Sequence, residues 1–63
     1  MGEQAEVLYD FDGQEASELS IKVGEILTIS NKDVGEGWWE GTNSQGKTGL
    51  FPESYVELYQ VRV

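Results

Sequence analysis

The chain has 63 residues, with 12 acidic and 4 basic side chains, no Cys, no His and a formal net charge of -8. A chain of this length is expected to form one small domain. Without thiols or imidazoles it lacks disulfides and the usual zinc ligands, so we expect no metal and no cofactor. The negative charge repels phosphate backbones and anionic headgroups, which argues against nucleic acid and against direct membrane contact. Transmembrane and signal-peptide patterns are absent, and we expect a cytoplasmic setting.

Short apolar runs alternate with clusters of Gly, Asn, Asp and Ser, and no helical period persists beyond two turns. This pattern predicts an all-β fold. Pro52 cannot donate to a sheet, so a single 3-10 turn is expected to begin there and end at Tyr55. Gly46 is expected to take a positive φ in a tight turn over residues 43–46. Strands are expected at residues 6–11, 25–30, 38–42, 47–51 and 56–58. Five short strands in so small a domain predict a closed or nearly closed barrel.

Alternation along these strands predicts which side chains face the barrel interior. Gly41 is expected among them because a larger side chain would point into a small barrel. Trp38 and Trp39 are adjacent on one strand and must face opposite sides, so Trp39 is expected to pack on the outer sheet. The expected inward positions are Val7, Leu19, Ile21, Leu27, Ile29, Gly41, Leu50 or Phe51, and Val56.

The remaining aromatic and proline positions predict a surface for a basic, proline-rich peptide. A polyproline II segment has a fixed backbone and exposes ridges of pyrrolidine rings, so flat aromatic faces can bind it with little ordering entropy left to lose. The acidic charge of the chain then selects for Lys or Arg beside the prolines. The positions concerned are Tyr9, Phe11, Trp38, Pro52 and Tyr55.

Four separated segments carry distinctive motifs. They are Val7-Leu8-Tyr9-Asp10-Phe11, Glu18-Leu19-Ser20-Ile21-Lys22-Val23-Gly24-Glu25, Trp38-Trp39-Glu40-Gly41 and Gly49-Leu50-Phe51-Pro52-Glu53-Ser54-Tyr55-Val56. Together they resemble the SH3 domain family, over about residues 5–59. These are similar to the family's Ala-Leu-Tyr-Asp-Tyr segment, its acidic-Leu-Ser-Phe stretch, its double-Trp strand and its Gly-Leu-Phe-Pro-x-Asn-Tyr-Val close. Any one of them alone is weak, but all four in order and at the expected spacing are specific.

The resemblance implies two proline pockets. Tyr9 and Tyr55 would form the first, with Phe11 extending its wall, and Tyr55, Pro52 and Trp38 would form the second. Trp38 would also separate these pockets from an acidic pocket that selects Arg or Lys in the ligand.

Glu18 matches the family position that pairs with the ligand's basic residue, and three further acids, Glu15, Asp33 and Glu36, are expected to supplement it. Asp10 is expected to be structural or weakly supportive. Ser54 replaces the Asn that is usual before the last Tyr, and a shorter hydroxyl needs a water to bridge to a ligand carbonyl.

We therefore expect an SH3 domain at residues 5–59, with extensions at 1–4 and 60–63. Catalysis is not expected, because the Ser residues have no His partner and so small a domain offers no deep cleft. The loops look most like those of sorting-nexin or F-BAR endocytic adaptor SH3 domains. This points to a monomeric module of a larger adaptor or scaffold in membrane traffic or signalling. The alternative is that the same surface binds a folded partner such as ubiquitin, or a segment of the parent chain that inhibits it.

Overall fold

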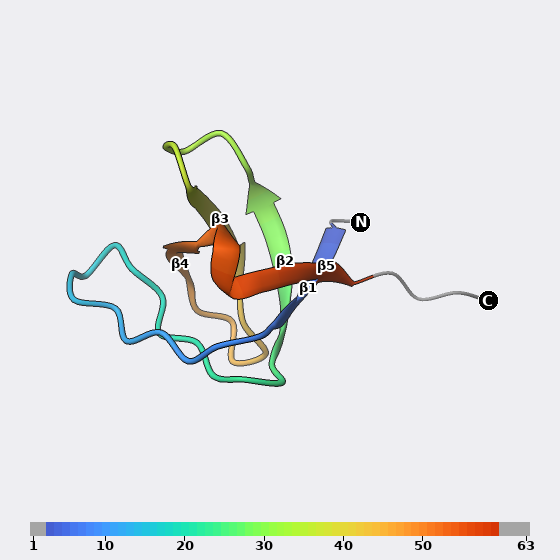
Figure 1. The fold of residues 1–63 in the computed structure, drawn as a ribbon. Helices are drawn as coiled ribbons and strands as arrows, with labels where there is room; N and C mark the ends of the chain where they lie inside the picture. The colour runs from blue at the N-terminus through green and yellow to red at the C-terminus, as the bar shows by residue number, and fades with distance from the viewer. Residues whose placement is uncertain (1–2, 60–63) are drawn as a thin grey trace.

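The computed structural model describes residues 3–59, which contain five antiparallel strands in a single curled sheet (Figure 1). The strands run in the spatial order β4-β3-β2-β1-β5. They are β1 Glu3–Val7, β2 Ile26–Asn31, β3 Trp38–Thr42, β4 Thr48–Pro52 and β5 Val56–Tyr59, with the 3-10 turn η1 Glu53–Tyr55 between the last two. The predicted small all-β barrel with a short 3-10 turn is confirmed.

The long connection between β1 and β2 closes the sheet over its β4 edge. The backbone N–H of Leu19 donates to the carbonyl of Leu50 at 2.8 Å, and the N–H of Leu50 donates to the carbonyl of Ser17 at 2.9 Å. An unpaired edge would invite pairing with another chain, so this segment protects β4. The rest of the connection projects well beyond the strands in Figure 1, where it is drawn blue to cyan.

The core consists of the inward positions that alternation predicts, together with one residue that was not predicted. The structure also decides between Leu50 and Phe51. Phe51 is fully buried whereas Leu50 is partly exposed, so Phe51 is the inward residue of that pair. Ala5 is also fully buried, although the sequence did not single it out. The buried apolar side chains are Ala5, Val7, Leu19, Ile21, Leu27, Ile29, Phe51 and Val56.

Gly41 is buried where β3 pairs with β2, and a larger side chain would not fit there. A Cβ there would lie 2.8 Å from the carbonyl oxygen of Thr28 and 3.1 Å from Cε2 of Phe51. The first of these neighbours is backbone and cannot move aside, which confirms the steric reason expected for this glycine. Gly46 has φ +82, as predicted for the β3–β4 turn.

Three predictions of local structure were wrong. The first strand is Glu3–Val7 and not residues 6–11, because Tyr9 and Phe11 lie in the irregular connection, where Phe11 forms an isolated bridge with Ile21. Pro52 is the extended last residue of β4, with ψ 129, so η1 begins one residue later than expected.

Trp39 is the third wrong prediction. It faces away from Trp38 as expected, but it pairs with Phe51 and packs against the core instead of lying on the outer sheet. Pairing partners in an antiparallel sheet share a face, and Phe51 is on the inner one. Of the expected extensions, residues 1–2 and 60–63 lie outside the described residues, and residues 3–4 belong to β1.

Candidate functional site

Four aromatic side chains form one continuous line of edge-to-face contacts. Tyr9 and Phe11 lie in the β1–β2 connection, Trp38 begins β3 and Tyr55 ends η1. The ring centroids are 5.7 Å apart for Tyr9 and Tyr55, 6.0 Å for Tyr55 and Phe11, and 5.9 Å for Phe11 and Trp38. The interplanar angles lie between 72° and 83°, which lets the positive edge of one ring meet the negative face of the next. We call these four residues the aromatic line.

The aromatic line lies at the surface, supported from below by the core. Tyr9 is 60% exposed and the other three residues are partly buried, with Phe11 and Tyr55 packing against the core cluster. Pro52 is the register partner of Trp38 across β3 and β4, so the two residues are on the same outer face. The structure therefore brings all five predicted aromatic and proline positions to one region.

The predicted acidic residues belong to two loops that flank this region. Glu18 and Glu15 are in the β1–β2 connection, where the N–H of Glu18 donates to the carbonyl of Glu15 at 2.9 Å. Asp33 and Glu36 are exposed in the β2–β3 loop that leads directly into Trp38. Within residues 3–59 no hydrogen bond or salt bridge joins the two pairs.

A family model described as a variant SH3 domain matches residues 7–57. The chain belongs to the SH3 domain family. Sorting nexin lst-4 of Caenorhabditis elegans is 50% identical over 58 residues, which are 90% of this chain and 10% of that protein. The likeness to sorting nexins expected from the loops is confirmed. The chain thus spans about a tenth of the length of this curated relative.

Solved SH3 domains have the same fold and include complexes with peptides. The C-terminal SH3 domain of myosin IB from Entamoeba histolytica, bound to an EhFP10(GEF) peptide, is 40% identical with a TM-score of 0.86, covering 95% of this chain and 97% of that one. The yeast Nbp2p SH3 domain in complex with a peptide from Ste20p is 38% identical with a TM-score of 0.88, covering 100% and 94%. SH3 domains are non-catalytic interaction modules.

Two residues of this SH3 domain depart from the family pattern inside the candidate surface. Ser54 is exposed in η1, so its hydroxyl is open to a ligand. Phe11 lies between Trp38 and Tyr55, and its ring keeps the aromatic line continuous without a phenolic hydroxyl. Both departures change hydrogen bonding and leave the apolar faces intact.

Glu18 has a structural role that sequence reasoning missed. Its Oε1 accepts hydrogen bonds from the backbone N–H groups of Gln14 at 2.6 Å and Glu15 at 3.3 Å, so the carboxylate closes its own loop. No sequence motif marks this contact, because it depends on a reversal of the backbone that only the fold supplies. Asp10 is structural in a similar way, since its Oδ1 accepts from the N–H of Val23 at 2.8 Å.

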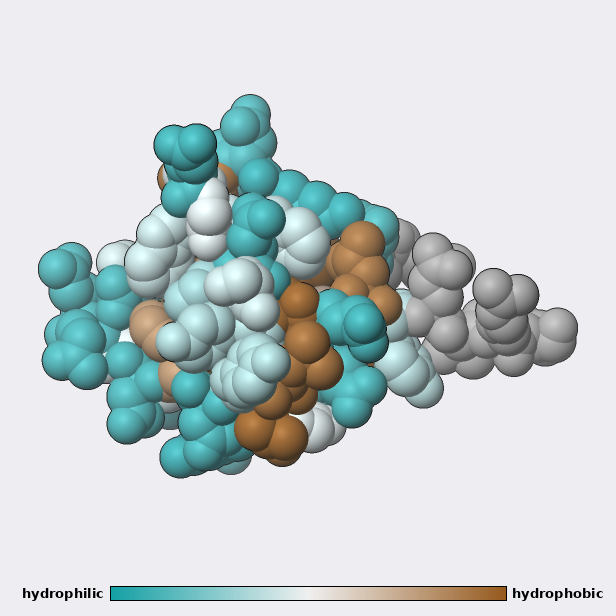
Figure 2. Space-filling model, viewed as in Figure 1, coloured by the Kyte–Doolittle hydropathy of each residue, from teal (hydrophilic) through white to brown (hydrophobic). Residues whose placement is uncertain are grey.

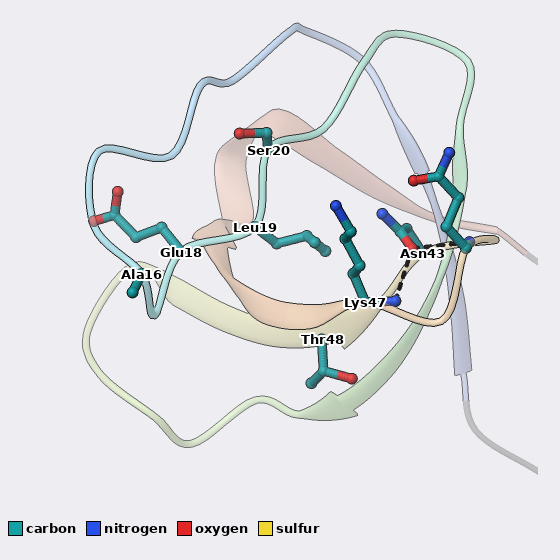
Figure 3. A pocket seen from close by; sticks show the side chains of 8 residues that line it. Ala16, Glu18, Leu19, Ser20, Asn43, Lys47 and Thr48 are labelled. Atoms are coloured by element: carbon teal, nitrogen blue, oxygen red, sulfur yellow. Dashed lines mark hydrogen bonds between the residues drawn. The ribbon is translucent and has the colours of Figure 1, made fainter.

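A hollow of about 470 Å³ lies between the end of the β1–β2 connection and the β3–β4 hairpin (Figure 3). It is lined by Ala16, Glu18, Leu19, Ser20, Asn43, Gln45, Lys47 and Thr48. Glu18 is the only predicted site residue in this set, and Figure 3 shows its carboxylate directed away from Lys47. Asn43 Oδ1 already accepts from the N–H groups of Gln45 and Lys47, at 2.9 and 3.0 Å. Because none of the aromatic-line residues lines the hollow, the two features are separate.

Within residues 3–59 no three metal-ligating side chains converge, and no helix there is long and apolar enough to cross a membrane.

Proposed function

We propose that this SH3 domain binds proline-rich polyproline II segments on the aromatic line, with a flanking Arg or Lys directed at the neighbouring acids. The observation that carries the proposal is the unbroken edge-to-face line from Tyr9 to Trp38 at the surface, in which Tyr9 is 60% exposed and the other three residues are partly buried. A domain with so small a core would gain stability by burying these rings. Keeping them at the surface is typical of an interaction site.

The geometry of the line suits a ligand with three residues per turn. Tyr9 and Tyr55 offer one slot for a proline, and Tyr55, Pro52 and Trp38 offer the next. A polyproline II helix presents its side chains at a regular rise of about 3.1 Å per residue and is already ordered in solution, so binding costs little entropy. Ser54 lies in η1 between Pro52 and Tyr55, where its hydroxyl can meet a ligand carbonyl.

Selectivity for a basic flank comes from the acids beyond Trp38. Glu18 is the principal partner of the ligand's Arg or Lys, and Glu15, Asp33 and Glu36 raise the local negative potential. Exposed ion pairs contribute about 0.2 to 1 kcal/mol each, so several acids are needed for a strong preference. The net charge of -8 also speeds the encounter with basic ligands.

Recruitment within a larger adaptor is the biological setting that we infer. The sorting-nexin relatives are far longer than this chain, and two structural neighbours were solved with peptides. We place this module, as a monomer, in a cytoplasmic scaffold of membrane traffic or signalling. A shallow groove of this kind supports a Kd of about 1 to 100 μM, weak enough for exchange.

Substitution of residues in the aromatic line tests the proposal. Trp38→Ala should weaken binding to a proline-rich peptide with a terminal Arg by about thirtyfold or more, because a central aromatic contributes about 2 kcal/mol or more. Tyr9→Ala provides a second variant with little effect on folding, since Tyr9 is 60% exposed. Gln45→Ala, in the exposed β3–β4 turn, is the control and should bind as wild type does.

Titration calorimetry alongside thermal melts measures these effects. The proposal fails if Trp38→Ala and Tyr9→Ala both remain folded and both bind the peptide with wild-type affinity.

A further inference from the structure

A second exposed surface lies on the outer face of β1, beside the Tyr9 end of the aromatic line. Ala5 and Val7 are 0% and 1% exposed, so Glu6 between them points outward, and Leu8, directly after the end of β1, is exposed. Across the sheet, Glu6 is the register partner of Ile26 in β2 and of Glu57 in β5. These outward residues lie on the opposite side of the sheet from the core.

Glu6 and Glu57 place two like charges directly opposite each other on neighbouring strands. Such a pair is destabilising in a sheet. Among residues 3–59 neither carboxylate has a hydrogen-bond or salt-bridge partner that would compensate it. A cation placed between the two carboxylates would relieve the repulsion and pair with both of them.

Exposed apolar side chains surround this acidic pair. Leu8 is 38% exposed, Ile26 36% and Tyr59 42%. Figure 2, in the same view as Figure 1, shows hydrophobic patches in the region of β1 and β5 with hydrophilic side chains around them. We call this surface the β1–β5 face and define it by Glu6, Leu8, Ile26, Glu57 and Tyr59.

The β1–β5 face adjoins the Tyr9 end of the aromatic line. Leu8 directly precedes Tyr9, and its backbone N–H donates to the carbonyl of Tyr55 at 2.8 Å. Leu8 and Glu6 are two residues apart, so they are separated by about 7 Å along the chain. An extended ligand that continued along β1 from the Tyr9 slot, at about 3.1 to 3.4 Å per residue, would reach Glu6 within three or four residues.

We propose that the β1–β5 face binds the flank of the same proline-rich ligand, at the end remote from the Arg that faces Glu18. An aliphatic side chain of the flank packs on Leu8 and Ile26, and a Lys or Arg two or three residues further on pairs with Glu6 and Glu57. This inference rests on the proposed function. It adds that the preferred partner carries basic charge at both ends of its proline core.

Three synthetic peptides test the inference by titration against the intact 63-residue chain. The first is a proline-rich core with Arg at one end. The second adds four residues containing Leu and Lys at the other end, and the third adds four Ser residues there instead. The Leu/Lys extension should tighten binding about threefold to tenfold, whereas the Ser extension should leave the affinity unchanged.

The Glu6→Gln/Glu57→Gln double variant should reduce this gain to about twofold or less, because the carboxylates supply the ionic part of it. Its affinity for the core peptide should be unchanged, which also shows that it is folded. An Asp12→Asn/Glu40→Gln double variant removes the same charge elsewhere and should retain the full gain.

The inference is overturned if the core peptide binds but the Leu/Lys extension adds nothing, or if the double variant keeps the whole gain. Failure of the core peptide itself to bind would contradict the proposed function instead, and this inference would fall with it.

Discussion

Glu18 is held in place by its own loop before any ligand arrives. One carboxylate oxygen accepts hydrogen bonds from the N–H groups of Gln14 and Glu15, and the side chain is partly buried. Charge-assisted hydrogen bonds of this kind are stronger than neutral ones. A carboxylate fixed in this way would lose less conformational entropy on pairing with the Arg of the proposed ligand, so the loop would add to the specificity that we propose for Glu18.

Glu18→Gln separates the charge of this side chain from its structural role. The amide keeps an oxygen that can accept from the two backbone N–H groups, so the loop should stay closed while the charge is lost. The preference for an Arg-bearing peptide over its Ala variant should fall by about twofold to fivefold, mainly at low ionic strength. Fluorescence titrations at two salt concentrations measure the ratio.

Glu40→Gln is the matched control for this substitution. Glu40 is on β3 and accepts a hydrogen bond from Ser30 Oγ at 3.1 Å, which the amide oxygen can also accept. The Arg preference of this variant should equal that of wild type. An equal Arg-to-Ala penalty in wild type and Glu18→Gln, insensitive to salt, would assign the basic pocket to other residues.

At the scale of the elements, the alternation of each strand fixes which face meets the core. In β2, Leu27 and Ile29 are buried while Thr28 between them is exposed. Ile29 is the register partner of Gly41 in β3, where β2 and β3 approach so closely that a Cβ on Gly41 would clash with the carbonyl oxygen of Thr28. The barrel therefore depends on β2 keeping its register.

Ile29→Ala should lower the free energy of unfolding by about 2 to 5 kcal/mol, because it removes buried methyl groups and leaves a cavity. Thr28→Ala on the same strand should change it by about 0.5 kcal/mol or less. Urea denaturation measures both, and Ile29→Val, expected to cost about 0.5 to 1.5 kcal/mol, extends the series if the Ala variant is unfolded. Equal midpoints for Ile29→Ala and Thr28→Ala would show that the inward face has been assigned incorrectly.

The sequence alone predicted the strands in which apolar residues alternate. It did not predict the strand bounds where aromatic residues lie at the surface. Trp38–Thr42 was predicted with its observed bounds, because the β3–β4 turn marks one end and the polar β2–β3 loop the other. The first strand was placed too late because Tyr9 and Phe11 resemble strand residues in a propensity count. In the structure they lie in the β1–β2 connection. There Tyr9 contacts Tyr55 and Phe11 contacts Trp38, residues that are far away in the sequence.

The candidate site was predicted as a set of residues, and the structure added how its members are held. Tyr9, Phe11, Trp38 and Tyr55 were identified together by resemblance, and the ring contacts show them as one line. The loop closure by Glu18 and the core contact of Trp39 were not predicted. Both depend on the register and curvature of distant strands, which no local pattern in the sequence encodes.

The whole molecule presents an acidic surface around a line of aromatic rings. Its net charge of -8 repels other copies of itself and attracts basic segments over distances of about a Debye length. The curled sheet is held by a small apolar core, and the residues of the proposed site lie mainly in the loops and in η1. Weak, rapidly exchanging association with basic proline-rich segments is the behaviour that this arrangement favours.

The two adjacent Trp residues provide the most direct measurement of the central claim that the aromatic line is the ligand surface. Trp38 belongs to the line, whereas Trp39 faces the other side of β3, packs against the core and has Lys32 Nζ 5.1 Å from its ring centroid. In an NMR titration of the ¹⁵N-labelled chain with a proline-rich, Arg-bearing peptide at up to about 1 mM, ten times the weakest expected Kd, each indole N–H gives its own signal. We predict that the Trp38 indole signal shifts progressively while the Trp39 signal stays nearly fixed. A shift of Trp39 without Trp38, or no shift of either, would contradict the account.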